Sequence, residues 1–279
     1  MIDDQRLRAV LEAGLGHTVG SMERTPLAGG SINDAFVVDV GERFVVKGNR
    51  RPLPRQFEAE ARGLEALRAA GTPLVVPRVV GFDDDVERGG FLVIEYLEPG
   101  RPAEDFDETV GRGLAALHAV PDERGFGFDL DGYCGATPQP NPWTASWPEF
   151  YADQRLGHHL RLAVDRGLDA DTARCVEAII ERIGEWIDDT EPALIHGDLW
   201  SGNLHCTADG RPALIDPAAY FGHREAELGM MSLFGGFRPR VWEAYQDAWP
   251  LAPGWRTRLG LYELYHLLNH FVLFGGGYA

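Results

Sequence analysis

The sequence is poor in cysteine, and it contains no long hydrophobic run. Its only cysteines among 279 residues are Cys134, Cys175 and Cys206. They are odd in number, widely spaced and form no C-x-x-C pair, so neither a disulfide framework nor a zinc site is predicted. Apolar runs stay below the roughly eighteen residues that a membrane span needs. The opening residues lack the basic and apolar regions of an export signal. We therefore expect a cytoplasmic protein.

Positive charge is also scarce. Lysine and arginine total 26 against 43 aspartate and glutamate residues, which gives a net charge of −17. Such a chain repels phosphate backbones and anionic lipids, so we expect neither a nucleic-acid partner nor a membrane partner. A polyanionic ligand would need a locally positive or Mg²⁺-loaded pocket. Lysines and arginines near glycines are therefore the first candidates for binding such a ligand.

Apolar residues make up 44% of the chain and aromatic residues 10%, which is enough for a substantial core. Apolar residues at helical spacing between Leu7 and Leu15 predict an opening helix. Residues 19–47 then read as antiparallel strands with a glycine-rich first turn, and residues 57–70 as a helix. Two further strands are expected near residues 78–82 and 91–97.

A turn-rich break at residues 98–102 separates these strands from a mainly helical half. We place the boundary there, with an N-terminal lobe at 1–97 and a C-terminal lobe at 98–279. The order predicts the α+β layout of a protein-kinase-like fold, in which a small antiparallel sheet with one main helix precedes a larger helical lobe. Within the second half we expect helices near 107–119, 147–166 and 170–188, an ordered aromatic loop at 121–148, short strands of a small hairpin at 193–195 and 213–215, and three closing helices.

The motif with the most specific spacing is H-G-D-L-W-S-G-N at residues 196–203, followed by L-I-D ending at Asp216. Asp198 and Asn203 are five apart, as in the kinase catalytic loop, and Asp216 lies thirteen beyond Asn203. Phosphoryl transfer needs a carboxylate at the attacking hydroxyl, together with an amide and a second carboxylate on Mg²⁺. We predict those roles for Asp198, Asn203 and Asp216 respectively. The alternative, a plain polar turn, would require all these positions to coincide by chance.

The first half supplies candidate nucleotide contacts. Gly29, Gly30 and Ser31 precede a strand and would let backbone N–H groups approach phosphates, although a double glycine is often only a turn. Lys47 closes the next strand and would bridge the α- and β-phosphates of ATP. The helix after it offers either Glu58 or Glu60 as an ion-pair partner.

The run L-V-I-E-Y-L at residues 92–97 leads directly into the break. We interpret it as the edge strand and hinge on which adenine rests, with Glu95 and Leu97 as its backbone partners.

Several histidines and aromatic residues are expected to have structural roles and not catalytic or binding roles. His266 and His270 lack the glutamate of a zinc-protease helix, His196 is expected to bond backbone and shape its loop, and the aromatic cluster around Trp143 and Trp147 is expected to be core and not a sugar platform.

The whole chain resembles the fructosamine kinases, or ketosamine-3-kinases, which are relatives of the aminoglycoside and choline kinases. Beyond the catalytic loop, the resemblance lies in five motifs: F-G-F near Phe126, C-G at Cys134, W-P-E-F-Y-A-D-Q-R-L at 147–156, D-P-A-A-Y-F-G-H-R-E-A-E-L at 216–228 and L-Y-H-L-L-N-H at 264–270.

This resemblance implies ATP- and Mg²⁺-dependent phosphorylation of the 3-hydroxyl of a ketoamine, either a small molecule or a protein-bound sugar adduct. The phosphorylated adduct then breaks down and frees the amine. The resemblance selects Glu60 over Glu58, implies that Trp200 faces the sugar, and has His223 and Glu225 brace the loop after Asp216. Some relatives carry cysteine in the glycine-rich loop where this chain has Ser31, so we expect no thiol switch there.

Two alternatives stay open. The catalytic loop alone also fits a kinase of the same fold that acts on an aminoglycoside, choline or a homoserine-like hydroxyl. A binder without turnover would usually have lost one of Lys47, Asp198 or Asn203, and all three are present. We expect a monomer or weak dimer.

Overall fold

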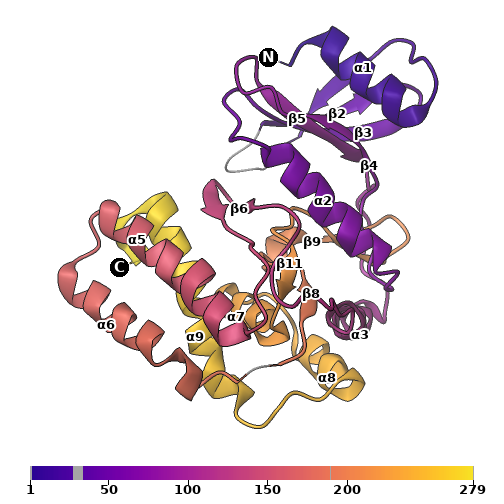
Figure 1. Cartoon of the computed structure of the whole chain (residues 1–279). Coiled ribbons are helices and arrows are strands. Elements are labelled where there is room, and N and C mark those ends of the chain that lie inside the picture. The colour runs from indigo at the N-terminus through magenta and orange to yellow at the C-terminus, as the bar shows by residue number, and fades with distance from the viewer. Residues whose placement is uncertain (1, 28–33, 189, 279) are drawn as a thin grey trace.

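The computed structural model describes residues 2–27, 34–188 and 190–278. The chain folds into two lobes, a β-sheet with two helices and a larger lobe that is mainly helical (Figure 1). The expected α+β layout is confirmed. Its N-terminal elements are α1 (Asp4–Leu15), β1 (Glu23–Pro26), β2 (Asp34–Asp39), β3 (Arg43–Asn49), α2 (Gln56–Ala69), β4 (Val79–Asp83) and β5 (Gly90–Glu95).

The described strands of this lobe form an antiparallel sheet in the order β1-β2-β3-β5-β4. Strand β5 therefore lies between β3 and β4, and the prediction of an edge strand at 92–97 is wrong. The sequence pattern was misleading because β5 is buried on both of its faces. Phe91 and Val93 pack with the residues of α1, whereas Leu92 and Ile94 pack with those of α2. A strand that is covered on both sides reads as a continuous apolar run.

The second lobe begins with α3 (Phe106–His118) and ends with three helices, as expected. Its other elements up to residue 185 are β6 (Gly132–Cys134), β7 (Thr137–Gln139), α4 (Trp147–Phe150), the π-helical η1 (Tyr151–Gly157), α5 (His158–Asp165), α6 (Ala170–Glu181) and η2 (Ile183–Glu185). After these come β8 (Ala193–Ile195), η3 (Ser201–Asn203), β9 (Leu204–Cys206), β10 (Pro212–Leu214), β11 (Tyr220–Gly222), α7 (Arg224–Phe234), α8 (Pro239–Ala248), α9 (Trp255–Phe274) and η4 (Gly276–Tyr278).

The short strands pair differently from the expected single hairpin. Strand β8 pairs with β11, and β10 pairs with β9. The strands expected at 193–195 and 213–215 therefore both form but do not pair with each other. Three-residue strands carry too little periodicity to reveal their partners in a sequence. The aromatic loop at 121–148 also contains an unexpected hairpin, β6–β7.

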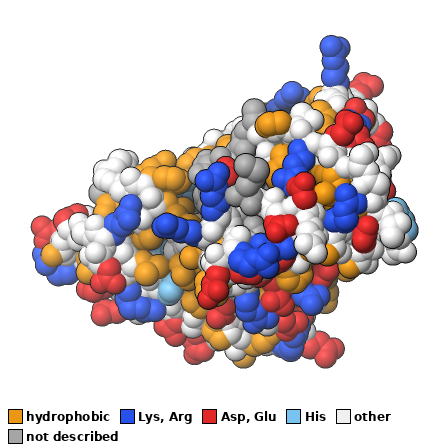
Figure 2. Space-filling model, turned by 90° about the horizontal axis from the view of Figure 1, so that it is seen from above, with side chains coloured by type: hydrophobic (Ala, Val, Ile, Leu, Met, Phe, Trp, Pro, Cys, Tyr) orange, Lys and Arg blue, Asp and Glu red, His pale blue; other side chains and the backbone are white. Residues whose placement is uncertain are grey.

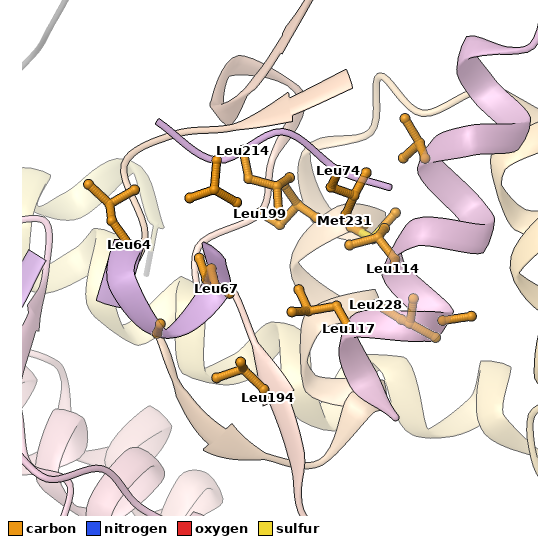
Figure 3. Close-up of a cluster of buried hydrophobic side chains, with 14 of the residues drawn as sticks. Leu64, Leu67, Leu74, Leu114, Leu117, Leu194, Leu199, Leu214, Leu228 and Met231 are labelled. Carbon is orange, nitrogen blue, oxygen red and sulfur yellow. The ribbon is translucent and has the colours of Figure 1, made fainter. Parts of the chain in front are cut away.

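A buried apolar cluster joins the two lobes (Figure 3). Leu64 and Leu67 of α2 lie opposite Leu114 and Leu117 of α3, with Leu199 of the catalytic loop among them. All five are 1% exposed or less. Burial of one such side chain contributes about 1.5–3 kcal/mol, so this cluster ties the catalytic loop to both lobes.

The surface is mixed in charge. On the face in Figure 2, positive and negative side chains are interspersed, and hydrophobic side chains gather toward one side. The net charge of −17 therefore does not make this face uniformly acidic. Within the described ranges, no helix combines the length and apolarity needed to cross a membrane.

Candidate active site

The catalytic-loop motif forms a tight turn after β8. Gly197 has φ 81°, and a Cβ atom at this position would lie 2.1 Å from the carbonyl oxygen of Ala218. Only glycine fits such a left-handed, crowded position. Beside it, the Nε2 atom of His196 lies 2.8 Å from the Ile215 carbonyl, and Nδ1 accepts a hydrogen bond from the backbone N–H of Asp198 at 3.3 Å. His196 thus shapes the loop, as expected.

Glu227 anchors the same turn from α7. Its carboxylate accepts hydrogen bonds from the backbone N–H groups of both His196 and Gly197, and its side chain is fully buried. Charge-assisted bonds of this kind are stronger than neutral ones. The sequence reasoning missed Glu227. The available clue was an acidic residue directly before residues 228–234, the mainly apolar part of α7.

Asp198, Asn203 and Asp216 meet at the end of this loop. The Nδ2 atom of Asn203 donates to the backbone carbonyl of Asp198 at 2.8 Å and lies 3.4 Å from its carboxylate. The same nitrogen is 3.5 Å from the backbone carbonyl of Asp216. The amide nitrogen therefore faces protein, and the amide oxygen of Asn203 is left as a possible metal ligand.

Asp216 has an unusual backbone. Its φ is 58°, and Arg55 is the only other described residue with a side chain and a positive φ. Such conformations cost of order 1–3 kcal/mol and collect at functional sites. The side chain of Asp216 is 48% exposed, so the strain directs a carboxylate that solvent and ligands can reach.

Lys47 connects the sheet to this region. Its ammonium bonds to the carboxylates of both Glu60 and Asp216. Although burial opposes the charged form, these two carboxylates raise the pKa of Lys47 well above its ordinary value. Glu58 instead pairs with Arg55 at 2.8 Å on the surface. The geometry thus favours Glu60 as the partner of Lys47.

One cavity of about 720 Å³ lies between the lobes. Gly29, Gly30 and Ser31 lie outside the described residues, but every other residue predicted for the site lines this cavity. These residues are Lys47, Glu60, Glu95, Leu97, Asp198, Trp200, Asn203 and Asp216.

The hinge side of the cavity is built from the end of β5. The backbone N–H of Glu95 donates to Arg78 at 2.8 Å, and the carbonyl of Leu97 accepts from the ring of His205 at 3.1 Å. Both residues line the cavity, but these two groups already have protein partners. The groups that the sequence analysis expects at adenine are the two others, the Glu95 carbonyl and the Leu97 N–H.

Trp200 also lines the cavity and is 43% exposed. Its indole lies over Gly202, where a Cβ atom would be only 2.2 Å from the ring. Gln139, another lining residue, accepts a hydrogen bond from the Tyr265 hydroxyl at 2.7 Å and donates one to the Ala218 carbonyl at 3.1 Å. The cavity therefore offers an aromatic face and a fixed amide.

Burial, together with the carboxylates of Glu227 and Asp216, raises the pKa of Asp198 to about 8. A perturbed carboxyl group at the centre of a cavity is typical of an acid–base residue. Added positive charge, such as a bound metal ion, would lower this pKa again.

His223 and Glu225 lie where the chain passes from β11 into α7. The Nδ1 atom of His223 lies 2.9 Å from the hydroxyl of Tyr262, and Glu225 forms an ion pair with Arg258 at 2.6 Å. Both contacts tie this passage to α9.

A second cavity of about 710 Å³ adjoins the first, and Phe128, Leu130, Tyr133 and Asn141 line both. We call this second cavity the outer cavity. Trp143 lines it, and the guanidinium of Arg124 lies 3.9 Å from the ring centroid of Trp143. The expectation that the aromatic cluster is core holds for Trp147, which is buried, but Trp143 is partly exposed.

The sequence is similar to a known family and to named proteins. The model of the fructosamine kinase family matches residues 4–279. A protein of Synechocystis named "probable ketoamine kinase" is 44% identical over 258 residues, which cover 92% of this chain and 86% of that protein. A rice (Oryza sativa subsp. indica) protein named chloroplastic protein-ribulosamine 3-kinase is 42% identical over 259 residues, covering 90% and 74% of the two chains.

Solved structures are also similar to this chain. A candidate fructosamine-3-kinase from Thermobifida fusca superposes with a TM-score of 0.86 at 37% identity, covering 99% of this chain and 95% of that one. An aminoglycoside phosphotransferase in ternary complex with AMP-PNP and hygromycin B gives 0.64 at 19% identity, covering 91% and 87%. The second likeness concerns the fold alone. Together they confirm the two-lobed, protein-kinase-like fold.

Proposed function

The chain belongs to the fructosamine kinase family, and from this premise we propose that it is an ATP-dependent ketosamine 3-kinase. Its acceptor would be the 3-hydroxyl of a fructosamine, ribulosamine or erythrulosamine. The relatives named ketoamine kinase and protein-ribulosamine 3-kinase support that acceptor class. The observation that carries the proposal is the meeting of Lys47, Asp198 and Asp216 at one cavity in a chain of this family.

Asn203 and Asp216 would hold Mg²⁺. An amide oxygen and a carboxylate are hard oxygen donors of the kind that Mg²⁺ prefers. The bond from Asn203 Nδ2 to the Asp198 carbonyl leaves the amide oxygen for the metal, and the carboxylate of Asp216 is half exposed. The donor set therefore fits the ion. When bound, Mg²⁺ would neutralise the charge that develops on the phosphates.

Lys47 would bind the α- and β-phosphates. Its present bond to Asp216 supports an exchange, because an arriving nucleotide with Mg²⁺ offers the ammonium a phosphate and the carboxylate a cation. Glu60 would hold Lys47 in place throughout. Gly29, Gly30 and Ser31 would cover the phosphates through backbone N–H groups.

Asp198 would act on the acceptor hydroxyl. As the oxygen attacks the γ-phosphorus, the bond to the leaving ADP breaks and the hydroxyl proton passes to the carboxylate. The raised pKa of Asp198, to about 8, supports a carboxylate that can take a proton. Trp200 would pack against the sugar, since aromatic faces suit the C–H faces of carbohydrates.

The outer cavity would receive the group attached to the ketoamine nitrogen. It shares four lining residues with the catalytic cavity and adds two carboxylates, Asp129 and Asp131, together with two arginines, Arg55 and Arg124. Arg124 pairs with Asp129, so Asp131 would be the carboxylate that meets a protonated amine. A lysine side chain, free or on a protein, is of suitable size for this space. Trp143 would cover its alkyl part.

We place the nucleotide-binding lobe at residues 1–97 and the catalytic and substrate-binding lobe at 98–279. The protein would act as a monomer or weak dimer in the cytoplasm, with no nucleic-acid or membrane partner, in keeping with its net charge of −17.

The test is ATP consumption with Mg²⁺ in the presence of ribulose-lysine, fructose-lysine, kanamycin, choline or no acceptor. We expect turnover with ketoamines only, with the product phosphorylated at the 3-hydroxyl by NMR. Activity on another alcohol alone would preserve the fold and overturn the acceptor. Omission of Mg²⁺ should abolish turnover, and no turnover on any acceptor would contradict the proposed activity.

A further inference from the structure

Two motifs with no assigned role converge behind Asp198. Cys134 ends strand β6, and His266 lies in the middle of α9. The Sγ atom of Cys134, a carboxylate oxygen of Asp198 and a ring nitrogen of His266 all lie within 4.8 Å of one another. Cys134 is 2% exposed and His266 is 3% exposed. Sulfur, nitrogen and oxygen donors thus meet at a buried point beside the catalytic cavity.

This cluster has unused donor atoms. No described residue offers a hydrogen bond to the Nδ1 atom of His266 or to the Oδ1 atom of Asn269. Asn269 does donate through Nδ2 to Cys134, at 3.2 Å to Sγ and 3.3 Å to the carbonyl oxygen. The thiol is therefore held in position while the imidazole next to it has a buried polar atom without a partner, which packing alone does not explain.

The charges around the cluster are of both signs. The carboxylates of Glu227 and Asp216 act on Asp198, whereas Arg155 brings positive charge to the Cys134 thiol and to the His266 ring. Burial also lowers the pKa of His266 to about 3, so its ring is neutral, as a metal ligand must be.

We propose that Cys134, His266 and Asp198 form a binding site for a thiophilic divalent cation of the Zn²⁺ type. Three protein ligands with an open fourth position are typical of zinc sites with a bound water. Zn–S bonds of about 2.3 Å and Zn–N bonds of about 2.0 Å imply ligand atoms roughly 3.5 Å apart, so the side chains would draw together by about 1 Å. The thiol proton and any proton carried by the Asp198 carboxyl leave to solvent, and the bound thiolate and carboxylate balance the charge of the ion.

Occupancy of this site inhibits phosphoryl transfer. The carboxylate of Asp198 that is coordinated to zinc is no longer available to the acceptor hydroxyl, whereas the nucleotide side at Lys47 stays open. Mg²⁺ does not compete, because it prefers oxygen ligands to thiolate. This consequence rests on the proposed function, but the binding itself does not.

Direct metal binding to the full chain is the first test. We expect one Co²⁺ or Zn²⁺ per chain, with a thiolate-to-cobalt absorption band in the near ultraviolet. Cys134→Ser should abolish the band and weaken zinc binding at least 100-fold, and His266→Gln should weaken it at least 10-fold. The controls Cys175→Ser, Cys206→Ser and His270→Gln should bind as the parent does. Circular dichroism and ATP titration show that each variant is folded.

Kinetics are the second test. In buffered free zinc at micromolar concentration, the parent should lose more than nine-tenths of its turnover, and a chelator should restore it. Cys134→Ser, compared with its own metal-free rate, should be unaffected. Equal zinc affinity in folded parent and Cys134→Ser, or the absence of a thiolate band, overturns the site. If the chain has no ketoamine kinase activity but still shows the band, the metal site stands and only the proposed function is overturned.

Discussion

The ammonium of Lys47 on strand β3 is hydrogen-bonded to the carboxylate of Asp216, 169 residues later in the chain. This ion pair joins the sheet lobe to the catalytic lobe across the cavity. Both partners are groups that a nucleotide with Mg²⁺ would engage. The contact is therefore one that substrate binding can exchange, whereas the bond from Lys47 to the buried Glu60 can persist.

The ion pair predicts different outcomes for two neighbouring glutamates. Glu60→Gln should lower kcat/KM for ATP about 10- to 100-fold, because a hydrogen bond to a charged group contributes about 1.5–3 kcal/mol. Glu58→Gln, which removes only a surface pair with Arg55, should stay within about 2-fold. Steady-state kinetics with varied ATP measure both. Equal losses in the two variants would contradict the assignment.

Asp198→Asn tests the proposed base. The amide keeps the shape of the side chain but cannot take the proton of the hydroxyl, so kcat should fall by about 10²- to 10⁴-fold. The dissociation constant of ATP, measured by calorimetry, should change by less than about 3-fold, because Asp198 lies on the acceptor side. Asp209→Asn, in the turn between β9 and β10, serves as the control. Near-normal turnover of Asp198→Asn would exclude the role.

Glu227→Gln should loosen the catalytic loop. The neutral amide oxygen can replace only part of the two bonds to His196 and Gly197, so we expect a loss of about 1–3 kcal/mol in the free energy of unfolding. Turnover should fall about 10-fold while KM for ATP changes little. Urea denaturation and kinetics measure these effects, with the exposed Glu177→Gln as control. A variant as stable as the parent would show that the anchor is dispensable.

Stability should fall in mild acid because three buried histidines are held neutral. Burial lowers the pKa of His159, His223 and His266 to about 3. In the unfolded chain their pKa is about 6.5, so the unfolded state binds more protons between these values. Their contribution is therefore complete above pH 6.5 and is lost as the pH falls toward 3. Each histidine adds a slope of up to about 1.4 kcal/mol per pH unit.

Denaturation midpoints at pH 7 and pH 5 measure this loss. His159→Gln cannot titrate, so its free energy of unfolding should fall less between the two values than that of the parent, by about 1–2 kcal/mol. The same fall in both proteins would mean that His159 is not held neutral in the folded state.

Trp143→Ala should distinguish acceptors by the size of their amine. An aromatic contact contributes about 0.5–1.5 kcal/mol, so KM for ribulose-lysine should rise up to about 10-fold. KM for the ribulosamine of methylamine, which cannot reach the outer cavity, should stay within about 2-fold. Trp186→Ala, whose indole packs on Arg182 away from both cavities, is the matched control. A similar rise for both acceptors would remove the outer cavity from substrate binding.

The sequence alone was sufficient for features that local spacing encodes. The interval from Asp198 to Asn203 is a property of one loop. The opening helix followed from apolar positions at helical spacing. These are short-range constraints, so they can be read from neighbouring residues.

Only the tertiary structure decided how distant segments pair. The position of β5 inside the sheet, the anchoring of His196 by Glu227 and the approach of Cys134 to His266 all join segments that are far apart in the chain. The three cysteines by themselves predicted no metal ligand set. Contacts of this kind depend on which surfaces bury one another when the whole chain folds, and no local pattern of residues encodes that choice.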